Sequence, residues 1–300
     1  MESAGTTKQQ GMEIWREAWA EEMEQRPPEL RRPFPDQSLF NIAEHAGRII
    51  QLLKEEHIPC CVVGTKALCY YGARRLSMTL EFCVPTEQLT AADSLFSTGS
   101  ASENYTAWRG RHPEAESRLP GSLYHTFPRY RLNHDGPLFD FYLIPSIDWR
   151  IDCVPENFEY CAQRGIPYPK LHLFAQSLLE RQNRSDLQDL VDGMDLTEEW
   201  GEENLNFDGR DGYAQWVADK NEKIRAALPQ RVKDEPFNAA MGTVLYELRT
   251  GLPADFRQVF THLVRTKEGR IGPEHPPSYF VTKYRAVGSP DPRTEIRFNV

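Results

Sequence analysis

The segment YYGARRLSMTLEFCVP, residues 70–85, contains a strand with one residue that does not suit an apolar core. Leu80 and Phe82 alternate as the buried face of a strand requires. Glu81 falls on the opposite face, in line with Thr79, so a carboxylate lies in the middle of an otherwise apolar strand. The role of Glu81 is therefore the functional question that this sequence raises.

The segments around this strand alternate between helical and strand-like patterns. Apolar residues at helical spacing predict helices, and short apolar runs bounded by Gly, Pro or Asn predict strands. The pattern predicts an α+β fold, followed by a helical domain. The predicted order is a helix at 36–59, a buried strand at 58–64, a short helix at 65–72, the strand with Glu81, a helix at 86–99, a polar surface loop at 98–122, and strands at 122–133 and 138–145.

The strand at 138–145 carries a second isolated carboxylate. Asp140 and Tyr142 share one face of this strand, whereas Phe141 and Leu143 share the other. A structural role for Asp140, as a hydrogen-bond acceptor for the facing strand, is one interpretation. A metal-binding role together with Glu81 is the other.

The chain of 300 residues is longer than one core usually needs, so several units are expected. We expect an N-terminal helical arm or disordered leader at 1–35, an α/β domain at 36–147, a helical domain at 148–233 and a C-terminal extension at 234–300. The extension is expected to contain helices and a Pro- and Gly-rich end. Amphipathic patterns predict helices at 167–182, 186–205, 212–228, 237–251 and 254–267.

The order of these motifs resembles the nucleotidyltransferase fold, in particular its small AbiEii-like members and their fungal relatives. The resemblance covers about residues 36–205 and rests on Gly64–Thr65 opening a short helix, on Thr79-x-Glu81 in the next strand, and on Asp140 in a later strand. In that fold, carboxylates gather two Mg²⁺ ions that hold a nucleoside triphosphate. The resemblance therefore implies a mixed sheet with flanking helices, followed by a helical domain. It also implies Mg²⁺ as cofactor and a nucleoside triphosphate or another small molecule as ligand.

The resemblance also implies a role for individual residues. Gly64 and Thr65 match the phosphate-binding pair, because glycine permits close backbone approach and a helix N-terminus offers free N–H groups to phosphate. Thr79 falls where the first metal-binding carboxylate should be, Glu81 at the second position and Asp140 at the third. Basic residues are expected to contact phosphate at three positions: Arg74, Arg75 and Arg129.

The departure at Thr79 decides the functional hypothesis. Threonine is neutral, and its hydroxyl is a poorer ligand for a hard cation than a carboxylate. We therefore expect nucleotide or Mg²⁺ binding with impaired or absent transfer to a small molecule or a protein hydroxyl. Asp148 or Asp152 could supply the missing carboxylate. The alternative is a non-catalytic interaction module that keeps the fold for protein–protein contacts, with Glu81 on a solvated face or paired with Arg74, Arg75 or Arg129.

Charge and composition limit the partners. The formal net charge of −9 and the short, acid-diluted basic clusters argue against binding to DNA or RNA. No apolar run approaches the ~20 residues that span a bilayer. The first ten residues, MESAGTTKQQ, have no apolar signal core. We expect a soluble cytoplasmic protein that does not bind membranes.

Six cysteines in a chain of this length do not indicate a disulfide scaffold. Four of them are close in sequence and have His57 nearby: Cys60, Cys61, Cys69 and Cys83. A zinc site is one interpretation, but the spacing lacks the C-x₂-C and H-x₃-H pairs typical of such sites. Reduced cysteines within the core are the interpretation that the pattern favours.

Overall fold

The computed structural model describes Glu24 and residues 42–73, 75, 79–108, 123–133, 140–162, 164–227, 255–270 and 290–294. The predicted arm at 1–35, apart from Glu24, and the predicted helix at 237–251 lie outside these residues. Within them, no helix combines the length and the apolar character that crossing a membrane requires. The α-helices are α2 (Ile42–Glu55), α3 (Gly64–Tyr70), α4 (Leu89–Ser97), α6 (Ser146–Trp149), α7 (Leu171–Glu180), α8 (Arg184–Met194), α9 (Glu198–Asn204), α10 (Tyr213–Ala227) and α13 (Phe256–Arg265).

The centre of the fold is a five-stranded mixed sheet in the order β1-β2-β5-β4-β3. Strands β2 and β5 are parallel, and the other neighbours are antiparallel. A separate pair of strands, β6 and β7, forms an antiparallel hairpin. The strands are β1 (Cys61–Val62), β2 (Thr79–Val84), β3 (Tyr105–Ala107), β4 (Arg129–Leu132), β5 (Asp140–Pro145), β6 (Phe158–Tyr160) and β7 (Pro167–Pro169). The predicted α+β class with a mixed sheet and flanking helices is confirmed.

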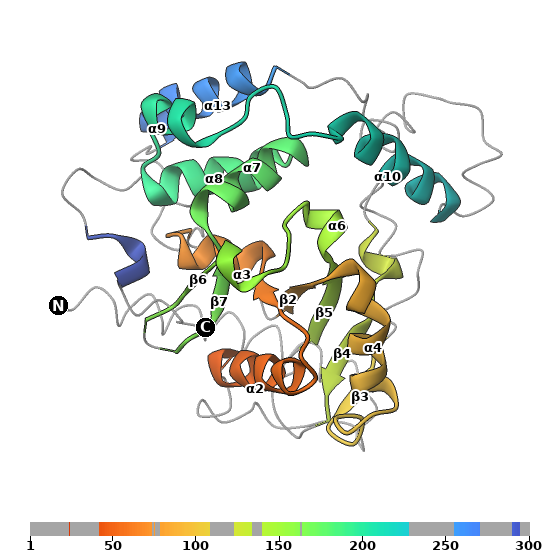
Figure 1. Ribbon diagram of the computed structural model, residues 1–300. Coiled ribbons are helices and arrows are strands. Elements are labelled where there is room, and N and C mark those ends of the chain that lie inside the picture. Colours follow the sequence, from red (N-terminus) through yellow and green to blue (C-terminus); the bar gives the residue numbers. More distant parts are fainter. Residues whose placement is uncertain are drawn as a thin grey trace.

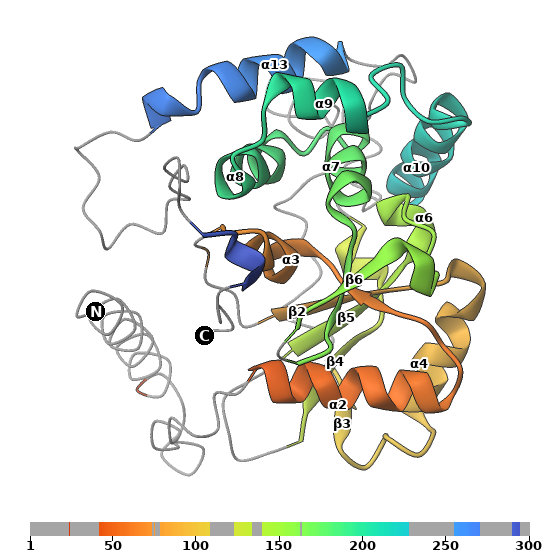
Figure 2. The same cartoon turned by 60° about the vertical axis from the view of Figure 1, so that its left-hand side comes forward.

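The sheet lies between two groups of helices. Figures 1 and 2 show α2 and α4 on one side of the sheet, and the group of α7, α8, α9, α10 and α13 on the other. On the α4 side, Phe96 packs edge-on against Phe141 with ring centroids 4.9 Å apart, and Phe141 stacks on Tyr130 at 5.5 Å. Burial of an aromatic side chain of this size contributes about 1.5–3 kcal/mol. The apolar face of β2 and β5 is thereby covered, which leaves the opposite face for the polar residues.

Two glycines allow α3 to approach α8 closely. Gly72 ends the turn after α3 with a φ of +96°, a conformation that favours glycine. A Cβ atom at Gly72 would lie 2.7 Å from the carbonyl oxygen of Gly193, and a Cβ atom at Gly193 would overlap the carbonyl oxygen of Tyr71. The backbone of the turn after α3 therefore touches the backbone of α8. This contact holds the helical layer, which consists of α7, α8, α9, α10 and α13, against α3.

Three local expectations differ from the structure. The predicted loop at 98–122 contains β3, because Tyr105 pairs with Leu132 and packs edge-on against Phe96. The predicted strand at 122–133 begins instead with a 3₁₀ turn at Tyr124–Thr126, and only Arg129–Leu132 forms β4. The predicted helix at 186–205 divides into α8 and α9. Asp195 adopts a φ of +53° there, and the Thr197 hydroxyl caps α9 by accepting the N–H of Trp200 at 3.1 Å.

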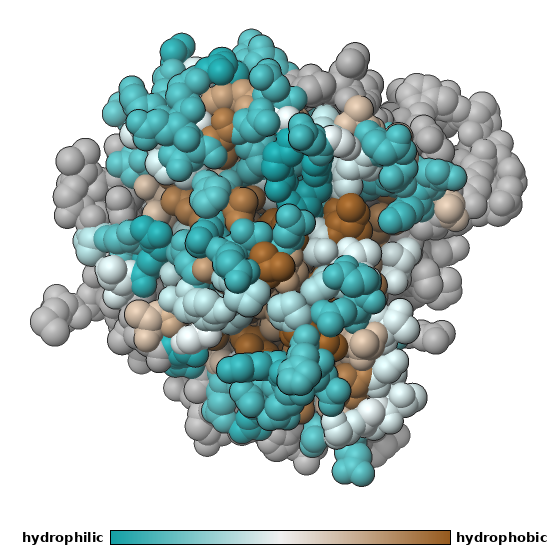
Figure 3. Space-filling view, in the orientation of Figure 1, coloured by the Kyte–Doolittle hydropathy of each residue, from teal (hydrophilic) through white to brown (hydrophobic). Residues whose placement is uncertain are grey.

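One hydrophobic core runs through the described part of the chain, from Ile42 in α2 to Val264 in α13. The sheet and the helices of the predicted helical domain share this core; for example, Tyr71 stacks on Phe174 of α7 at 5.8 Å. The predicted boundary near residue 147 stays a prediction. Figure 3 shows a mostly hydrophilic face with smaller hydrophobic patches, one of them over α6, where Ile147 is 43% exposed.

Candidate functional site

Glu81 lies against the N-terminus of α3. Strand β2 directs Thr79 and Glu81 to the same face, and the Glu81 carboxylate accepts a hydrogen bond from the backbone N–H of Thr65. The Tyr124 hydroxyl donates a second hydrogen bond to Glu81 Oε2. The structure therefore brings together three residues that the sequence assigned to one site: Gly64, Thr65 and Glu81.

Gly64 is the residue that permits this approach. Its φ is +63°, and a Cβ atom at this position would overlap both carboxylate oxygens of Glu81. Any other residue would be strained in the backbone and would also push Glu81 away from Thr65. The strand-to-helix turn thus places a carboxylate where a helix N-terminus would otherwise face an external anion.

The surroundings of Glu81 favour its neutral form. Burial raises the pKa of the Glu81 carboxyl, and this effect exceeds the opposing hydrogen bond from Tyr124 and the charge of Arg181. The Tyr124 hydroxyl has a pKa raised well above its usual range, first because of burial and then because of the Glu81 charge. The pair therefore forms a half-buried hydrogen-bonded unit.

Asp140 lies on the same sheet face, and both of its carboxylate oxygens form ion pairs with arginines. It is the register partner of Thr79, one strand away from Glu81. Arg129 Nη2 lies 2.8 Å from Asp140 Oδ2, and Arg131 Nε lies 2.6 Å from Oδ1. Asp140 is only 7% exposed, so these two guanidinium groups compensate its charge within the protein. Neither oxygen points to an open site.

The two described basic residues that were predicted to contact phosphate, Arg75 and Arg129, pair with carboxylates of the protein. Arg75 forms ion pairs with Asp186, at 2.5 Å, and with Asp189, both in α8. It therefore ties the segment before β2 to the helical layer. Arg74 lies outside the described residues. Arg129, besides its contact with Asp140, places its guanidinium carbon 5.0 Å from the centre of the Tyr142 ring.

Arg181 is a residue of this region that the sequence did not identify. It follows α7, and its guanidinium carbon lies 3.7 Å above the Trp149 ring. Its Nη2 is 3.7 Å from Asp148, whereas its buried Nε and Nη1 have no hydrogen-bond partner among the described residues. Two free donors on a buried guanidinium indicate a water or an anionic ligand group beside it. No spacing in the sequence singles out this arginine, because its neighbours come from distant segments.

Asp148 connects Arg181 to α10. Lys220 Nζ lies 3.0 Å from Asp148 Oδ1. Burial would raise the pKa of the Asp148 carboxyl, but Lys220 and Arg181 together hold it below its usual range. Asp148 is therefore a charged, paired group, and Asp152, the other predicted substitute ligand, is exposed.

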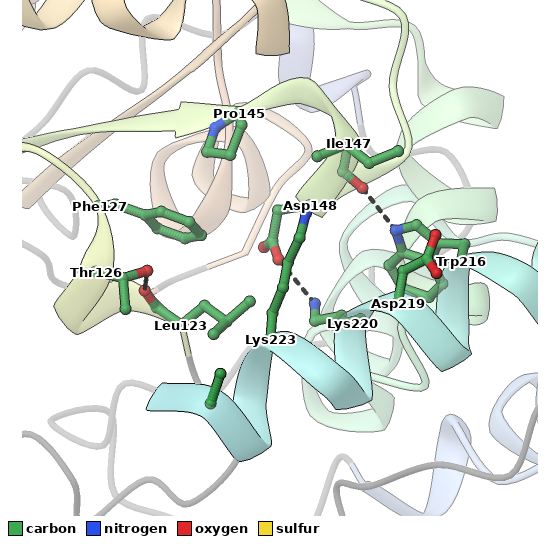
Figure 4. A pocket seen from close by; sticks show the side chains of 11 residues that line it. Leu123, Thr126, Phe127, Pro145, Ile147, Asp148, Trp216, Asp219, Lys220 and Lys223 are labelled. Carbon is green, nitrogen blue, oxygen red and sulfur yellow. Dashed lines mark hydrogen bonds and ion pairs between the residues drawn. The ribbon is translucent and has the colours of Figure 1, made fainter. Parts of the chain in front are cut away.

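A cavity of about 430 Å³ opens beside this polar layer. In Figure 4 the side chains of α10 line one side, and Phe127 and Pro145 line the other, with Asp148 between them. The Trp216 indole N–H donates to the Ile147 carbonyl oxygen at 2.7 Å and fixes the rim. The lining residues are Leu123, Thr126, Phe127, Pro145, Ile147, Asp148, Trp216, Asp219, Lys220, Lys223 and Ala226. Such a mixture of apolar walls and a few charges is typical of small-molecule sites.

Comparisons with known proteins identify a similar solved structure but no related sequence family. No protein-family model and no curated protein sequence match the chain. Among solved structures, the chain is similar to the crystal structure of an antigenic nucleotidyltransferase-like protein from Paracoccidioides brasiliensis. The similarity has a TM-score of 0.39 and 15% identity, and it covers 69% of this chain and 97% of that chain. A TM-score of this size does not establish a common fold, and the family of the chain is not shown by it.

Proposed function

We propose that this chain is a nucleotidyltransferase-like protein that binds a nucleotide, or a small molecule of similar size and charge, with impaired or absent nucleotidyl transfer. The observation that supports it best is the cavity between the sheet and α10, with lysines on one wall and apolar side chains on the other. Its volume of about 430 Å³ lies in the range of ligand pockets, about 300–1,000 Å³.

The cavity offers a separate surface to each part of such a ligand. Phe127, Ile147 and Trp216 offer apolar surface to a flat ring. Lys223 is exposed at the rim and Lys220 lies deeper beside Asp148, so the cationic groups are arranged along α10. Arg181, through Asp148, extends this polar layer toward Glu81. A phosphate group directed to the lysines and a ring against Trp216 fit this distribution.

The positions expected to hold two metal ions argue against transfer. The first offers only the neutral hydroxyl of Thr79. The second, Glu81, is hydrogen-bonded to Tyr124 and has a raised pKa because of burial. The third, Asp140, faces two arginines. Two-metal catalysis requires open, ionised carboxylates that bridge the metals and the phosphate.

This donor set does not fit Mg²⁺. A hard dication needs several anionic or neutral oxygens around it, and the two arginines at Asp140 would repel it. The proposed function therefore includes no metal-dependent transfer step at Glu81 and Asp140. The proposed binding depends on the cavity and its lysines and not on a metal.

A thermal-shift titration tests the proposal. The full chain is titrated with ATP, CTP, GTP and UTP, with and without Mg²⁺ or Mn²⁺. A ligand that binds only the folded state stabilises it by about 2.7 kcal/mol at a hundredfold excess over Kd. We expect a shift with at least one nucleotide without added metal.

Two lysine variants locate the site. Lys223→Ala should weaken binding by about tenfold, which corresponds to about 1.4 kcal/mol. Lys54→Ala, in the last turn of α2 and also exposed, should leave it unchanged. Absence of a thermal shift with every nucleotide would overturn the proposal. Equal effects of the two variants on binding would show that the nucleotide binds outside this cavity.

A second function is favoured by one specific contact. Because the Glu81 carboxylate occupies the N-terminus of α3, the protein itself closes Gly64–Thr65, the pair that the resemblance assigns to phosphate. That closure supports the interaction module, a protein that keeps the fold for protein–protein contacts. Absence of nucleotide shifts in the wild type and in Glu81→Ala, which removes the closing carboxylate, would favour this function over the first.

A further inference from the structure

Three cysteines from three separate segments meet inside the core. Cys61 in β1 is the register partner of Cys83 in β2, and Cys153 comes from the segment after α6. Their sulfur atoms all lie within 4.8 Å of one another. Cys61 and Cys83 are fully buried, and Cys153 is 4% exposed. The group lies on the same face of β2 as Glu81, two residues further along the strand, but shares no side chain with the cavity.

The three thiols are directed at one another and not merely packed among apolar side chains. Cys153 Sγ also lies 3.1 Å from the carbonyl oxygen of Cys83 and 3.5 Å from that of Pro59. Three sulfurs from separate segments that converge in this way can surround one ion, which cysteine binds as the thiolate.

The number and type of donors select the ion. A structural zinc site takes four ligands, and this group of described residues supplies three sulfurs without a histidine or carboxylate. Thiolates select soft ions, among them Cu(I). Three sulfurs bound to one ion in a plane at about 2.3 Å lie about 4.0 Å apart, so the three sulfurs must approach one another by at most about 0.8 Å.

We propose that Cys61, Cys83 and Cys153 form a three-sulfur binding site for Cu(I). The reaction is an exchange without redox change: Cu⁺ forms a bond to each of the three sulfurs, the three S–H bonds break, and the three protons leave to water. The neutral group of three thiols thereby becomes a Cu(I) trithiolate with a net charge of about −2. The bound ion links β1 and β2 to the segment that leads into the helical layer.

The test is a competition for Cu(I) under reducing, oxygen-free conditions. The full chain is mixed with a chromophoric Cu(I) chelator, and the stoichiometry and affinity are obtained from the loss of its absorbance. X-ray absorption then identifies the ligands. We expect one Cu(I) per chain with sulfur neighbours at about 2.3 Å and no nitrogen or oxygen neighbour.

Cysteine variants test the assignment to these residues. Cys153→Ser should weaken Cu(I) binding by more than about a hundredfold, because even partners outside the ligand shell change metal affinity by about 10–100-fold. Cys161→Ser is the matched control, since Cys161 is also a buried cysteine, with 5% exposure, and lies outside the group. Thermal melts of the apo variants check folding, and Cys61→Ser replaces Cys153→Ser if the latter does not fold.

Three outcomes overturn the proposal. The wild type could fail to compete with the chelator, Cys161→Ser could lose Cu(I) as strongly as Cys153→Ser, or the absorption spectrum could show nitrogen or oxygen ligands. Zn²⁺ is tested in parallel. Tighter binding of Zn²⁺, with a fourth ligand, would show that the group is a zinc site and would also overturn the Cu(I) proposal. Nucleotide binding in the cavity does not enter any of these measurements.

Discussion

Asp140 and Glu81 lie on the same face of neighbouring parallel strands, and they differ in the groups that contact them: guanidinium groups in one case and neutral hydrogen-bond donors in the other. Asp140 lies between the guanidinium groups of Arg129 and Arg131, so its anion is compensated by ion pairs. Glu81 is surrounded by a tyrosine hydroxyl, a backbone N–H and the glycine of a tight turn, and burial raises its pKa. One sheet face therefore stabilises one carboxylate by charge pairing, whereas the other is held by hydrogen bonds in surroundings that raise its pKa.

This difference shows why similar positions on a strand do not make similar sites. Removal of a carboxylate that pairs with two arginines strongly lowers the free energy of unfolding, because the remaining charges are left buried. A carboxyl held by neutral donors depends instead on hydrogen bonds and on pH. The two positions should therefore respond differently to substitution and to proton concentration.

The largest effect is expected for Asp140→Ala. Removal of the carboxylate leaves Arg129 and Arg131, whose side chains are 17% and 18% exposed, without their common counter-charge. The free energy of unfolding should fall by about 3–5 kcal/mol, as for other broken buried ion pairs. Urea denaturation measures this change. Asp152→Ala, at an exposed aspartate, should change it by less than about 0.5 kcal/mol. Equal losses in both variants would contradict the role of the two arginines.

Gly64→Ala should have the next largest effect. Its φ of +63° disfavours alanine by about 1–2 kcal/mol, and the new Cβ would also displace the Glu81 carboxylate. Gly165 has the same φ of +63° with nothing within 4 Å of a Cβ, so Gly165→Ala isolates the backbone contribution. We expect Gly64→Ala to lose at least about 1 kcal/mol more than Gly165→Ala in urea denaturation. Similar losses would mean that Glu81 does not restrict this turn.

Replacement of Glu81 separates its hydrogen bonds from its charge. Glu81→Ala removes the acceptor of the Tyr124 hydroxyl and of the Thr65 N–H, and it should cost about 1–2 kcal/mol. Glu81→Gln keeps a carbonyl oxygen as acceptor and removes the ionisation. It should cost less than Glu81→Ala at neutral pH, as measured by thermal or urea unfolding. A larger loss for the glutamine variant would show that the charge of Glu81 is required.

The smallest effect is the pH dependence contributed by Glu81. Its pKa in the folded state is raised above the ordinary value of 4.5. From pH 4.5 upward to the raised pKa, the folded state keeps a proton that the unfolded state has released. The stabilising contribution of the neutral carboxyl is therefore present at lower pH and is lost as pH rises through this window, with a slope of at most about 1.4 kcal/mol per pH unit.

The difference in unfolding free energy between the wild type and Glu81→Gln, followed from about pH 4 to about pH 8, measures this contribution. The wild type should lose stability relative to the glutamine variant as pH rises. A constant difference would contradict a raised pKa. Asp148, whose pKa is lowered by Lys220 and Arg181 against the effect of burial, should give the opposite dependence, with stability lost as pH falls.

Much of the fold around the site was predictable, because alternation is a local property of the chain. The pattern placed Thr79 and Glu81 on one face of β2, and Asp140 with Tyr142 on one face of β5, as the register shows. It also predicted Gly64 at a strand-to-helix turn. It did not predict β3 within a polar segment, since packing of Tyr105 against Phe96 overrides the local pattern there.

The partners of the charged and nucleophilic residues were not predictable. The basic residue expected to contact phosphate, Arg75, pairs with Asp186 instead, more than a hundred positions later. Tyr124 and Arg181 approach Glu81 from separate segments, and no spacing in the sequence indicates this. The sequence grouped Cys61 and Cys83 with Cys60 and Cys69, whereas the sulfur group of the structure takes its third member from a distant segment.

The sequence by itself determined the α+β class, the faces of β2 and β5, and the place of Gly64, because strand periodicity and turn geometry depend on neighbouring residues. Only the tertiary structure decided that Asp140 faces two arginines, that Glu81 closes the start of α3, and that Cys153 joins Cys61 and Cys83. The physical reason is that ion pairs, buried hydrogen bonds and sulfur contacts join atoms brought together by packing of distant segments. Residue spacing along the chain carries no record of that packing.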